Sequence, residues 1–361
     1  MKFFVLSFFV LPLFTSAQPV KKYTMDLDTL FGSYFKAGEP GGAVLIVKNG
    51  QIIYKNAFGI ADIDTKEPIT AKTLFNIGSI SKTFVAYGIL KLAKEGKLSL
   101  DDDLSKYFPD FKNKEIAKKV RLYHLLTHTS GIPDSRNVKE NHDFYLTAKD
   151  EENFAPLKQT DTLQFEPGTK YRYSNPAFNG LALIIEKVTG NKWQEYIAEN
   201  IFKPSGMKTS TITDGPYPTS GVSHAYVLND KKKFEELDYG EEPTFPAAGN
   251  GGVWSSVEEL WQYEQAIQHF DLLDSEWIKR SRTVYSFPLW KDSIPQRLGL
   301  SWFITLEAGQ PMIGHTGSQG GFVSDYCWLP EKKIFYVLLC NIPKPTREIR
   351  NKLFAILLKD K

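Results

Sequence analysis

The chain has 361 residues, of which 42% are hydrophobic, 14% aromatic and 24% charged, and this composition is typical of a globular protein with a large buried core. It excludes a disordered, collagen-like or disulfide-scaffolded chain. The 44 Lys and Arg residues and the 42 Asp and Glu residues leave a formal charge of +2, so no overall field would attract nucleic acid or an acidic membrane. We therefore expect no nucleic-acid partner.

The first residues have the pattern of a secretory signal. Lys2 precedes the apolar stretch 3–14, and the small residues Thr15-Ser16-Ala17 follow it. The apolar stretch is too short for a membrane span, and no other segment reaches the roughly 18 apolar residues that a span needs. We expect residues 1–17 to be a signal peptide and the mature protein to be exported, either to the periplasm or to the medium.

Strand patterns occur at both ends of the sequence. After a predicted helix over residues 26–37, the apolar run 43–48, the turn dipeptide Asn49-Gly50 and the run 51–54 predict a β-hairpin. Strand-like runs return only near the C-terminus, before a final helical pattern over residues 347–358; they cover residues 299–306, 312–315, 322–329 and 334–340. This arrangement predicts a sheet assembled from both ends of the chain.

The middle of the chain is helical in character. Apolar residues recur with helical spacing in five segments, which are residues 83–95, 120–127, 177–189, 192–200 and 257–269. These patterns predict an α/β (α+β) fold, with an antiparallel sheet flanked by helices and a mostly helical region inserted into it. We assign residues 18–95 and 250–361 to the sheet domain and residues 96–249 to the insertion, with the active site in the cleft between them.

The two cysteines, Cys327 and Cys340, lie in the last predicted hairpin. If residues 330–332 form its turn, Cys327 faces Tyr336, and Cys340 lies four residues beyond the facing position. At roughly 3.3 Å per residue the separation is about 13 Å, which is too long for a disulfide. We expect two buried free thiols, although an exported protein meets an oxidising environment.

Three Ser-x-x-Lys tetrads place a hydroxyl and an amine one helical turn apart: Ser33–Lys36, Ser79–Lys82 and Ser205–Lys208. Only the tetrad Ser79–Lys82 leads into a long helix with an apolar face. A cation in the first turn opposes the helix dipole, so Lys82 suggests a use other than helix stabilisation. If Lys82 is buried, its neutral amine can accept the proton of Ser79. The alternative is that Ser79 serves only as the N-cap of this helix.

Two further segments contain residues suited to catalysis. In Tyr173-Ser174-Asn175, Tyr173 could relay protons and Asn175 could orient a substrate through its amide; the alternative is that Asn175 is a helix N-cap followed by Pro176. The segment 314–321 is rich in glycine, which lets a backbone approach a ligand closely, and an N–H at a strand edge there could form half of an oxyanion hole. Its alternative is a plain hairpin connection.

Two histidines are spaced as metal ligands could be. His124 and His128 lie at positions i and i+4 of a helical run. The sequence contains no evident third ligand cluster, and packing and the end of the helix before Gly131 explain both residues better. We expect neither a metal nor a cofactor.

Taken in chain order, Ser79-x-x-Lys82, Tyr173-x-Asn175 and His315-Thr316-Gly317 resemble the three motifs of the serine β-lactamase and penicillin-binding protein superfamily. The chain is most similar to the class C branch, which groups class C β-lactamases with D-alanyl-D-alanine carboxypeptidases, D-aminopeptidases and esterases. Supporting similarity covers residues 125–131, 165–168 and 204–207, and the whole resemblance spans roughly residues 41–341. It implies a β-lactamase/transpeptidase-like fold.

The resemblance also implies roles for the motif residues. Ser79 would be the nucleophile, Lys82 its base, Tyr173 the proton relay and Asn175 the amide that positions the substrate. The backbone N–H groups of Ser79 and Ser318 would form the oxyanion hole, and the substrate would lie along the third motif, which comprises His315, Thr316, Gly317 and Ser318.

The third motif of this family more often begins with Lys than with His. Histidine is mostly neutral at pH 7.5 if its pKa stays near about 6.5, so His315 would lack the charge that holds a substrate carboxylate. An arginine such as Arg297 or Arg172 could supply that charge instead.

These observations predict an exported serine hydrolase that forms an acyl-enzyme with an ester or amide. We expect an esterase or a D-amino-acid peptidase, with small molecules or short peptides, including peptides like those of peptidoglycan, as substrates. The alternative is a class C-like β-lactamase, or a penicillin- or peptidoglycan-binding protein that acylates without turnover. The sequence does not define the oligomeric state.

The signal pattern gives a direct test. Cleavage after Ala17 leaves a mature chain that begins at Gln18, and the intact mass of the exported protein should match that chain. A mass that retains the first residues would contradict the prediction.

Overall fold

The computed structural model describes residues 19–136, 148–213, 217–236 and 248–359. The predicted signal peptide, residues 1–17, lies outside this part of the chain. Among the described residues, no helix is long and apolar enough to cross a membrane.

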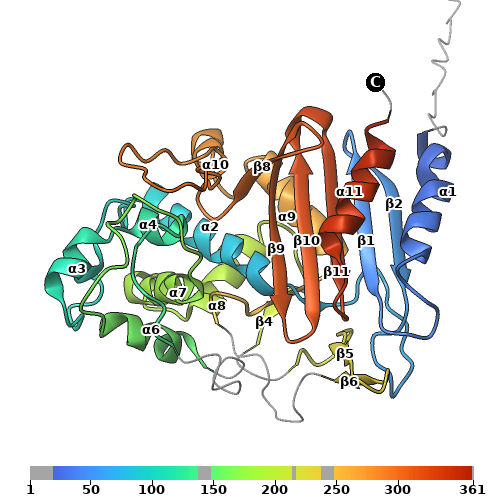
Figure 1. Ribbon diagram of the computed structural model, residues 1–361, viewed down its shortest axis with the longest axis horizontal. Coiled ribbons are helices and arrows are strands. Elements are labelled where there is room, and N and C mark those ends of the chain that lie inside the picture. The colour runs from blue at the N-terminus through green and yellow to red at the C-terminus, as the bar shows by residue number, and fades with distance from the viewer. Residues whose placement is uncertain (1–18, 137–147, 214–216, 237–247, 360–361) are drawn as a thin grey trace, which may run out of the picture.

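Six antiparallel strands form the main sheet, in the order β2-β1-β11-β10-β9-β8 (Figure 1). The first two belong to the start of the chain and the other four to its end: β1 Gly42–Lys48, β2 Gln51–Phe58, β8 Phe303–Glu307, β9 Gln310–Gln319, β10 Phe322–Leu329 and β11 Ile334–Cys340. The predicted Asn49-Gly50 hairpin joins β1 to β2, and both turn residues have positive φ. The prediction of an antiparallel sheet built from both ends is confirmed.

Helices cover both faces of this sheet. On one face α1 (Pro19–Gly32) and α11 (Thr346–Leu357) pack against each other, and on the other α9 (Val257–Gln268) packs against β1 and β11 (Figure 1). The alternation of side chains along a strand produces these two layers, since successive residues point to opposite faces. The helix predicted over residues 26–37 is displaced: it ends at Gly32, where the Ser33 hydroxyl donates to the Leu30 carbonyl (2.6 Å) and closes a turn.

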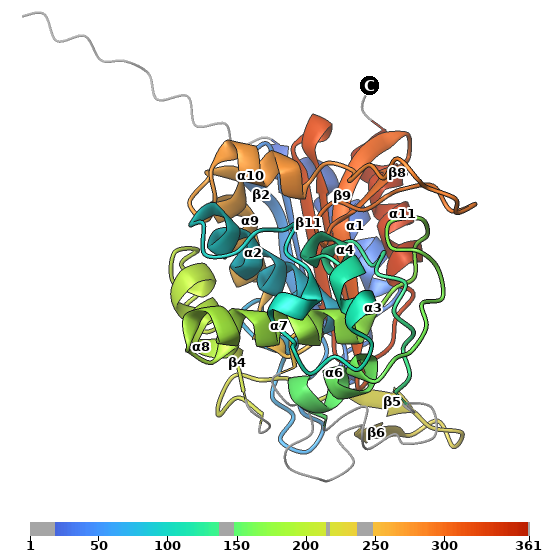
Figure 2. The same cartoon turned by 90° about the vertical axis from the view of Figure 1, so that its left-hand side faces the viewer.

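The helices from the middle of the chain form the other half of the molecule, with α7 crossing the view in Figure 2. They are α2 Ser81–Lys94, α3 Lys114–Lys119, α4 Leu122–Leu126, α6 Asp150–Lys158, α7 Asn175–Thr189 and α8 Trp193–Ile197, with α10 Ser275–Ser281 near the end. The sequence patterns missed α3, α6 and α10, because none exceeds nine residues and α6 contains Pro156. One hydrophobic core joins these helices to the face of the sheet that α9 covers. Because this core continues across the predicted boundaries of the insertion, at residues 96 and 249, those boundaries stay a prediction.

Short elements complete the described chain. The strands β3 Phe75–Asn76, β7 Val253–Ser255 and β4 Thr211–Ile212 form a small sheet, and β5 Tyr226–Leu228 pairs with β6 Phe234–Glu236. Single turns of 3-10 helix lie at η1 Gly78–Ile80, η2 Leu104–Lys106 and η4 Pro330–Lys332, and residues Ala198–Phe202 form a π-helical turn, η3.

The register of the last hairpin agrees with the sequence. Cys327 lies opposite Tyr336, while Cys340 lies opposite Val323, and both cysteines are buried and free. The prediction of two buried free thiols is therefore confirmed by the structure.

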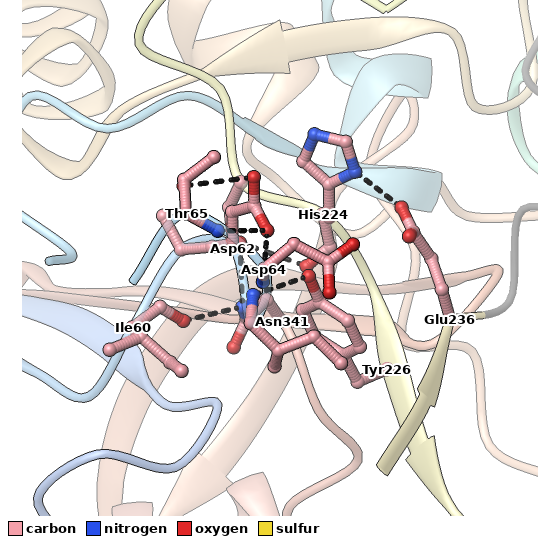
Figure 3. A network of polar contacts seen from close by, with 11 residues as sticks. Ile60, Asp62, Asp64, Thr65, His224, Tyr226, Glu236 and Asn341 are labelled. Atoms are coloured by element: carbon pink, nitrogen blue, oxygen red, sulfur yellow. Dashed lines mark hydrogen bonds and ion pairs between the residues drawn. The ribbon is translucent and has the colours of Figure 1, made fainter. Parts of the chain in front are cut away.

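Asn341, directly after β11, ties three distant segments together (Figure 3). Its Oδ1 accepts a hydrogen bond from the Gly41 N–H (2.7 Å), and its Nδ2 donates to the Ile60 carbonyl (3.0 Å). Its own carbonyl accepts from the Tyr226 N–H (2.8 Å), and the Tyr226 hydroxyl in turn accepts from the Ile63 N–H (3.0 Å). One buried amide thus holds together the segments next to β1, β2 and β5.

Replacing Asn341 with Ala should lower the free energy of unfolding by about 2–4 kcal/mol, because the buried Gly41 N–H and Ile60 carbonyl lose their partners. Urea unfolding measures this change. The exposed Asn191 provides the control: Asn191→Ala should change the same quantity by less than about 0.5 kcal/mol. Equal effects of the two substitutions would contradict the role of the Asn341 amide.

Candidate active site

Ser79 lies in the 3-10 turn η1, immediately before α2. The Asn76 side chain accepts a hydrogen bond from the Gly78 N–H (2.8 Å) and so fixes the turn. The alternative that Ser79 is the N-cap of α2 is wrong: the N-cap is Ile80, which offers no side-chain cap. The Ser79 hydroxyl therefore does not cap the N-terminus of α2.

Lys82, in the first turn of α2, is fully buried, and its Nζ lies 2.9 Å from Ser79 Oγ. The same Nζ donates a hydrogen bond to the Asn250 carbonyl (2.6 Å). Aromatic rings surround the amine, with the ring centres of Tyr173 and Phe178 at 5.2 and 5.8 Å from Nζ. In the described part of the chain, neither of the other two Ser-x-x-Lys tetrads has such a contact, and the Ser33 hydroxyl donates to a backbone carbonyl.

Burial holds the pKa of Lys82 well below its usual value of 10.5, and the positive charge of Arg136 lowers it further. No carboxylate among the described residues forms an ion pair with this lysine. A neutral amine has two N–H groups and one lone pair. When one N–H binds the Asn250 carbonyl, the lone pair is free to receive the proton of the Ser79 hydroxyl.

Tyr173 and Asn175 lie at the beginning of α7, and the Tyr173 ring is next to Lys82. The N-cap of α7 is Ser174, whose hydroxyl accepts from the Ala177 N–H (3.3 Å), and Asn175 is the first helical residue. The alternative of Asn175 as N-cap is therefore wrong, because Ser174 takes that role. The half-buried Asn175 amide is left available for another contact.

The His128 ring packs against the Tyr173 ring, with ring centres 4.3 Å apart. Its Nδ1 accepts a hydrogen bond from the Ser174 N–H (3.0 Å), and burial, with the charge of Lys82 adding, holds the pKa of His128 well below 6.5. His124 likewise accepts from the Arg121 N–H (3.0 Å) through Nδ1. Both rings thus bind backbone, and the described residues contain no group of three metal-ligating side chains. No motif in the sequence indicated that the His128 ring would pack against Tyr173.

The third motif lies on strand β9, at the edge of the sheet. β8 pairs with β9 only as far as Gly314, and the remaining residues of β9 lie against η1. A Cβ on Gly317 would be 2.0 Å from the Ile77 carbonyl oxygen, and a Cβ on Gly78 would be 2.7 Å from the Ser318 nitrogen. Only glycine allows this approach, which brings the backbone at Ser318 next to the turn that contains Ser79. The alternative of a plain hairpin connection holds only for the turn at residues 320–321.

Strand β9 therefore carries all four residues of the motif, and they differ in exposure. His315 and Gly317 are buried, whereas Thr316 and Ser318 are exposed. His315 Nδ1 is 2.7 Å from the Thr316 carbonyl oxygen, and Nε2 is buried without a hydrogen-bond partner among the described residues. Burial lowers the pKa of His315 to about 3, and the charge of Lys82 adds to the effect. The pKa of His315 therefore does not stay near 6.5, since the ring is shielded from water.

A cavity of about 200 Å³ is lined by neighbours of His315 and His128, and neither Ser79 nor Lys82 is on its wall. Aromatic side chains form much of its wall, namely those of Tyr171, Tyr285, Phe287, Trp290 and Phe303. The Phe303 ring lies 5.2 Å from the His315 ring, and the Tyr171 ring lies 6.2 Å from that of His128. Arg297, one of the two arginines that could supply a charge for a substrate carboxylate, also lines the cavity, whereas Arg172 is not among the lining residues.

Comparison with known proteins identifies the family. The family model described as Beta-lactamase matches residues 27–360. Protein flp of Staphylococcus aureus (strain MRSA252) is 29% identical over 336 residues, which cover 88% of this chain and 62% of that protein. Protein flp and Penicillin-binding protein 4* of Bacillus subtilis (strain 168) are longer than this chain, which covers 41% to 62% of their length.

Solved structures agree with this assignment. The octameric penicillin-binding protein homologue from Pyrococcus abyssi superimposes with a TM-score of 0.79 at 28% identity, covering 94% of this chain and 76% of that one. The D-amino acid amidase from Ochrobactrum anthropi SV3 superimposes with a TM-score of 0.76 at 21% identity, covering 94% of this chain and 98% of that one, and so shows the same fold. The predicted fold class is confirmed.

Proposed function

This chain belongs to the beta-lactamase family, and from that premise we propose that it is an exported serine hydrolase that forms an acyl-enzyme with an ester or amide substrate. The observation that carries the proposal is the buried Lys82 amine, 2.9 Å from Ser79 Oγ and without a paired carboxylate in the described chain. A neutral amine in this place is a general base for the serine hydroxyl. The signal pattern over residues 1–17 supports export.

In the proposed reaction, Ser79 Oγ attacks the carbonyl carbon of the substrate while its proton passes to Lys82 Nζ. The backbone N–H groups of Ser79 and Ser318 hold the negative oxygen that forms. The proton then returns through Tyr173 to the leaving group, whose bond to the carbonyl carbon breaks. Water adds to the resulting ester, releases the acid and restores the Ser79 hydroxyl, so no cofactor enters the balance.

The state of His315 favours substrates without a carboxylate. A neutral ring whose Nδ1–H donates to the Thr316 carbonyl presents a lone pair at Nε2, where many relatives have the cation of a lysine. A charge-assisted hydrogen bond contributes roughly 1.5–3 kcal/mol, so its loss should weaken discrimination for anionic substrates by about 10- to 150-fold. We therefore rank an esterase or D-amino-acid peptidase before a β-lactamase.

The aromatic-lined cavity, whose Phe303 contacts His315, supports a substrate with an apolar group. Arg297 on its wall carries a permanent charge, and it supports a D-alanyl-D-alanine peptide as a second substrate type. Similarity to a penicillin-binding protein homologue favours one further candidate, a protein that is acylated but does not turn over.

Ser79 should be the residue that a fluorophosphonate or β-lactam probe modifies, because its hydroxyl alone among the three tetrads lies beside a buried amine. Ser79→Ala should lower turnover by about a thousandfold or more, and Lys82→Ala should do comparable damage because the two residues act as one unit. Peptide mapping of the labelled protein and steady-state kinetics measure these outcomes.

Label on Ser33 or Ser205, or full activity of the Ser79→Ala variant, would overturn the proposed function. Label on Ser79 that persists for hours, without product release from any ester or peptide, would favour the binding protein that acylates without turnover.

Substrate preference should not depend on the charge of His315 between pH 7.5 and pH 5.5, because a pKa of about 3 leaves the ring neutral at both values. We expect a short-chain aryl ester or a D-alanyl-D-alanine peptide to have a higher kcat/KM than a chromogenic cephalosporin, with a ratio that varies less than about threefold between the two pH values. A cephalosporin preferred by more than about a hundredfold at pH 7.5 would contradict the argument from the missing charge. A tenfold gain for the cephalosporin at pH 5.5 would instead show that His315 becomes protonated there.

A further inference from the structure

A buried carboxylate lies among the helices near Lys82, outside the motifs described above. Asp150 is the first residue of α6 and only 6% exposed. Its Oδ1 accepts hydrogen bonds from the Gly249 N–H (2.8 Å) and from Asn179 Nδ2 (2.7 Å), and its Oδ2 accepts from Trp193 Nε1 (2.8 Å). No cation of the described chain pairs with it. Because burying an unpaired carboxylate is costly, a side chain so placed calls for a reason beyond packing.

The hydrogen bonds of Asp150 lead directly to the Lys82 amine. Gly249 precedes Asn250, whose carbonyl accepts the 2.6 Å hydrogen bond from Lys82 Nζ. Asn179, on α7, extends toward the same residue, with its Nδ2 3.5 Å from Asn250 Oδ1. Gly249 also packs tightly on α7, since a Cβ there would be 2.7 Å from the Ala182 side chain. Asp150 therefore fixes the backbone that offers the carbonyl to the amine.

We propose that Asp150 is a positioning residue of this hydrolase: its Oδ1 holds residues 249–250 so that the Asn250 carbonyl aims the lone pair of Lys82 at Ser79. This inference rests on the proposed function. A neutral amine accepts a proton only at its lone pair. The hydrogen bonds of its two N–H groups determine the direction in which that lone pair points. A displacement of the carbonyl by about 1 Å turns the lone pair away from Oγ, and errors of that size cost about a hundredfold in rate.

The charge of Asp150 makes this anchor dependent on pH. Burial raises the pKa of Asp150 to about 7, while its three hydrogen-bond donors oppose the rise. The charged side chains near it are Glu186 on α7, Lys149 just before α6, Glu151 and Glu152 on α6, and Lys192 and Glu195 at the start of α8. Above pH 7 the carboxylate is ionised and its hydrogen bonds are charge-assisted. Below pH 7 it gains a proton, and its hydrogen bond with the Gly249 N–H becomes weaker. Activity should thus lose this support as the pH falls through 7.

The test compares the wild type with Asp150→Asn, which resembles the protonated carboxyl at every pH. At pH 8.5 we expect kcat for an aryl ester to fall about tenfold in the variant, with KM within about twofold. The ratio of the wild-type kcat to that of the variant should decline toward about one at pH 5.5, with a midpoint near 7. Because the titration of Lys82 is common to both proteins, it largely cancels in this ratio.

Trp193→Phe is the matched control, because it removes the hydrogen bond to Oδ2 and leaves both bonds to Oδ1. Its kcat at pH 8.5 should stay within about threefold of the wild type. Because the Trp193 donor is one of those that oppose the rise in the pKa of Asp150, the midpoint of its kcat profile should lie at a higher pH than that of the wild type. In Asp150→Asn, the new amide N–H₂ faces the Trp193 N–H, so the double variant with Trp193→Phe relieves that conflict if the single variant folds poorly. The double variant should show the same pH-dependent ratio.

A ratio that stays flat with pH, an equal rise of KM, or a Trp193→Phe variant that behaves like Asp150→Asn would each overturn the positioning role. Labelling of wild-type Ser79 by a fluorophosphonate separates this failure from that of the function itself. If Ser79 is labelled and the ratio is flat, only the role of Asp150 is lost. If wild-type Ser79 is not labelled, the proposed hydrolase is lost and the positioning role with it.

Discussion

The burial of a lysine amine without a partner carboxylate is the constraint on which the site depends. Removing an ammonium group from water costs far more than removing a neutral amine, so the interior favours the neutral form of Lys82. The surroundings suit that form: two aromatic rings, one backbone carbonyl and one hydroxyl contact the amine. An ion pair with Asp or Glu would have kept the charge on the lysine and removed its capacity to act as a base.

The rest of the fold places three backbone segments around that amine. The part of β9 that extends beyond β8 approaches η1 at Gly317 and Gly78, where no other residue would fit. The loop at Asn250 approaches from the other side, tied to α6 and α7 by Asp150 and Asn179. Since β9, η1 and α7 come from widely separated parts of the sequence, the site exists only once the sheet has assembled and the helices have packed on it. A substitution that loosens the packing of the helices on the sheet should therefore also disturb the geometry of the site.

The sequence predicted the local features well and the consequences of burial poorly. The Asn49-Gly50 turn, the register that separates Cys327 from Cys340 and the Ser79–Lys82 pair all follow from spacing and turn chemistry over a few residues. The support of Tyr173 by His128 and the anchoring of residue 249 by Asp150 could not be predicted, because each joins segments from different elements. The low pKa of His315 could not be predicted for the same reason: the sequence shows the type of a titratable group, and only packing decides its exposure to water.

Three basic groups lie close to one another at the site. Burial lowers the pKa of Lys82, His128 and His315, and a charge on Lys82 lowers the pKa of both histidines further. The site therefore favours the neutral form of each group, in contrast to a site with a permanent ammonium group. In the proposed reaction, charge appears only when the proton moves from Ser79 to Lys82 and the substrate oxygen becomes negative. The two new charges are opposite and close together in a dry environment, where the backbone N–H groups of η1 and β9 are already oriented. Such a site interacts more strongly with the transition state than with a neutral ground state, and this difference is what accelerates a reaction.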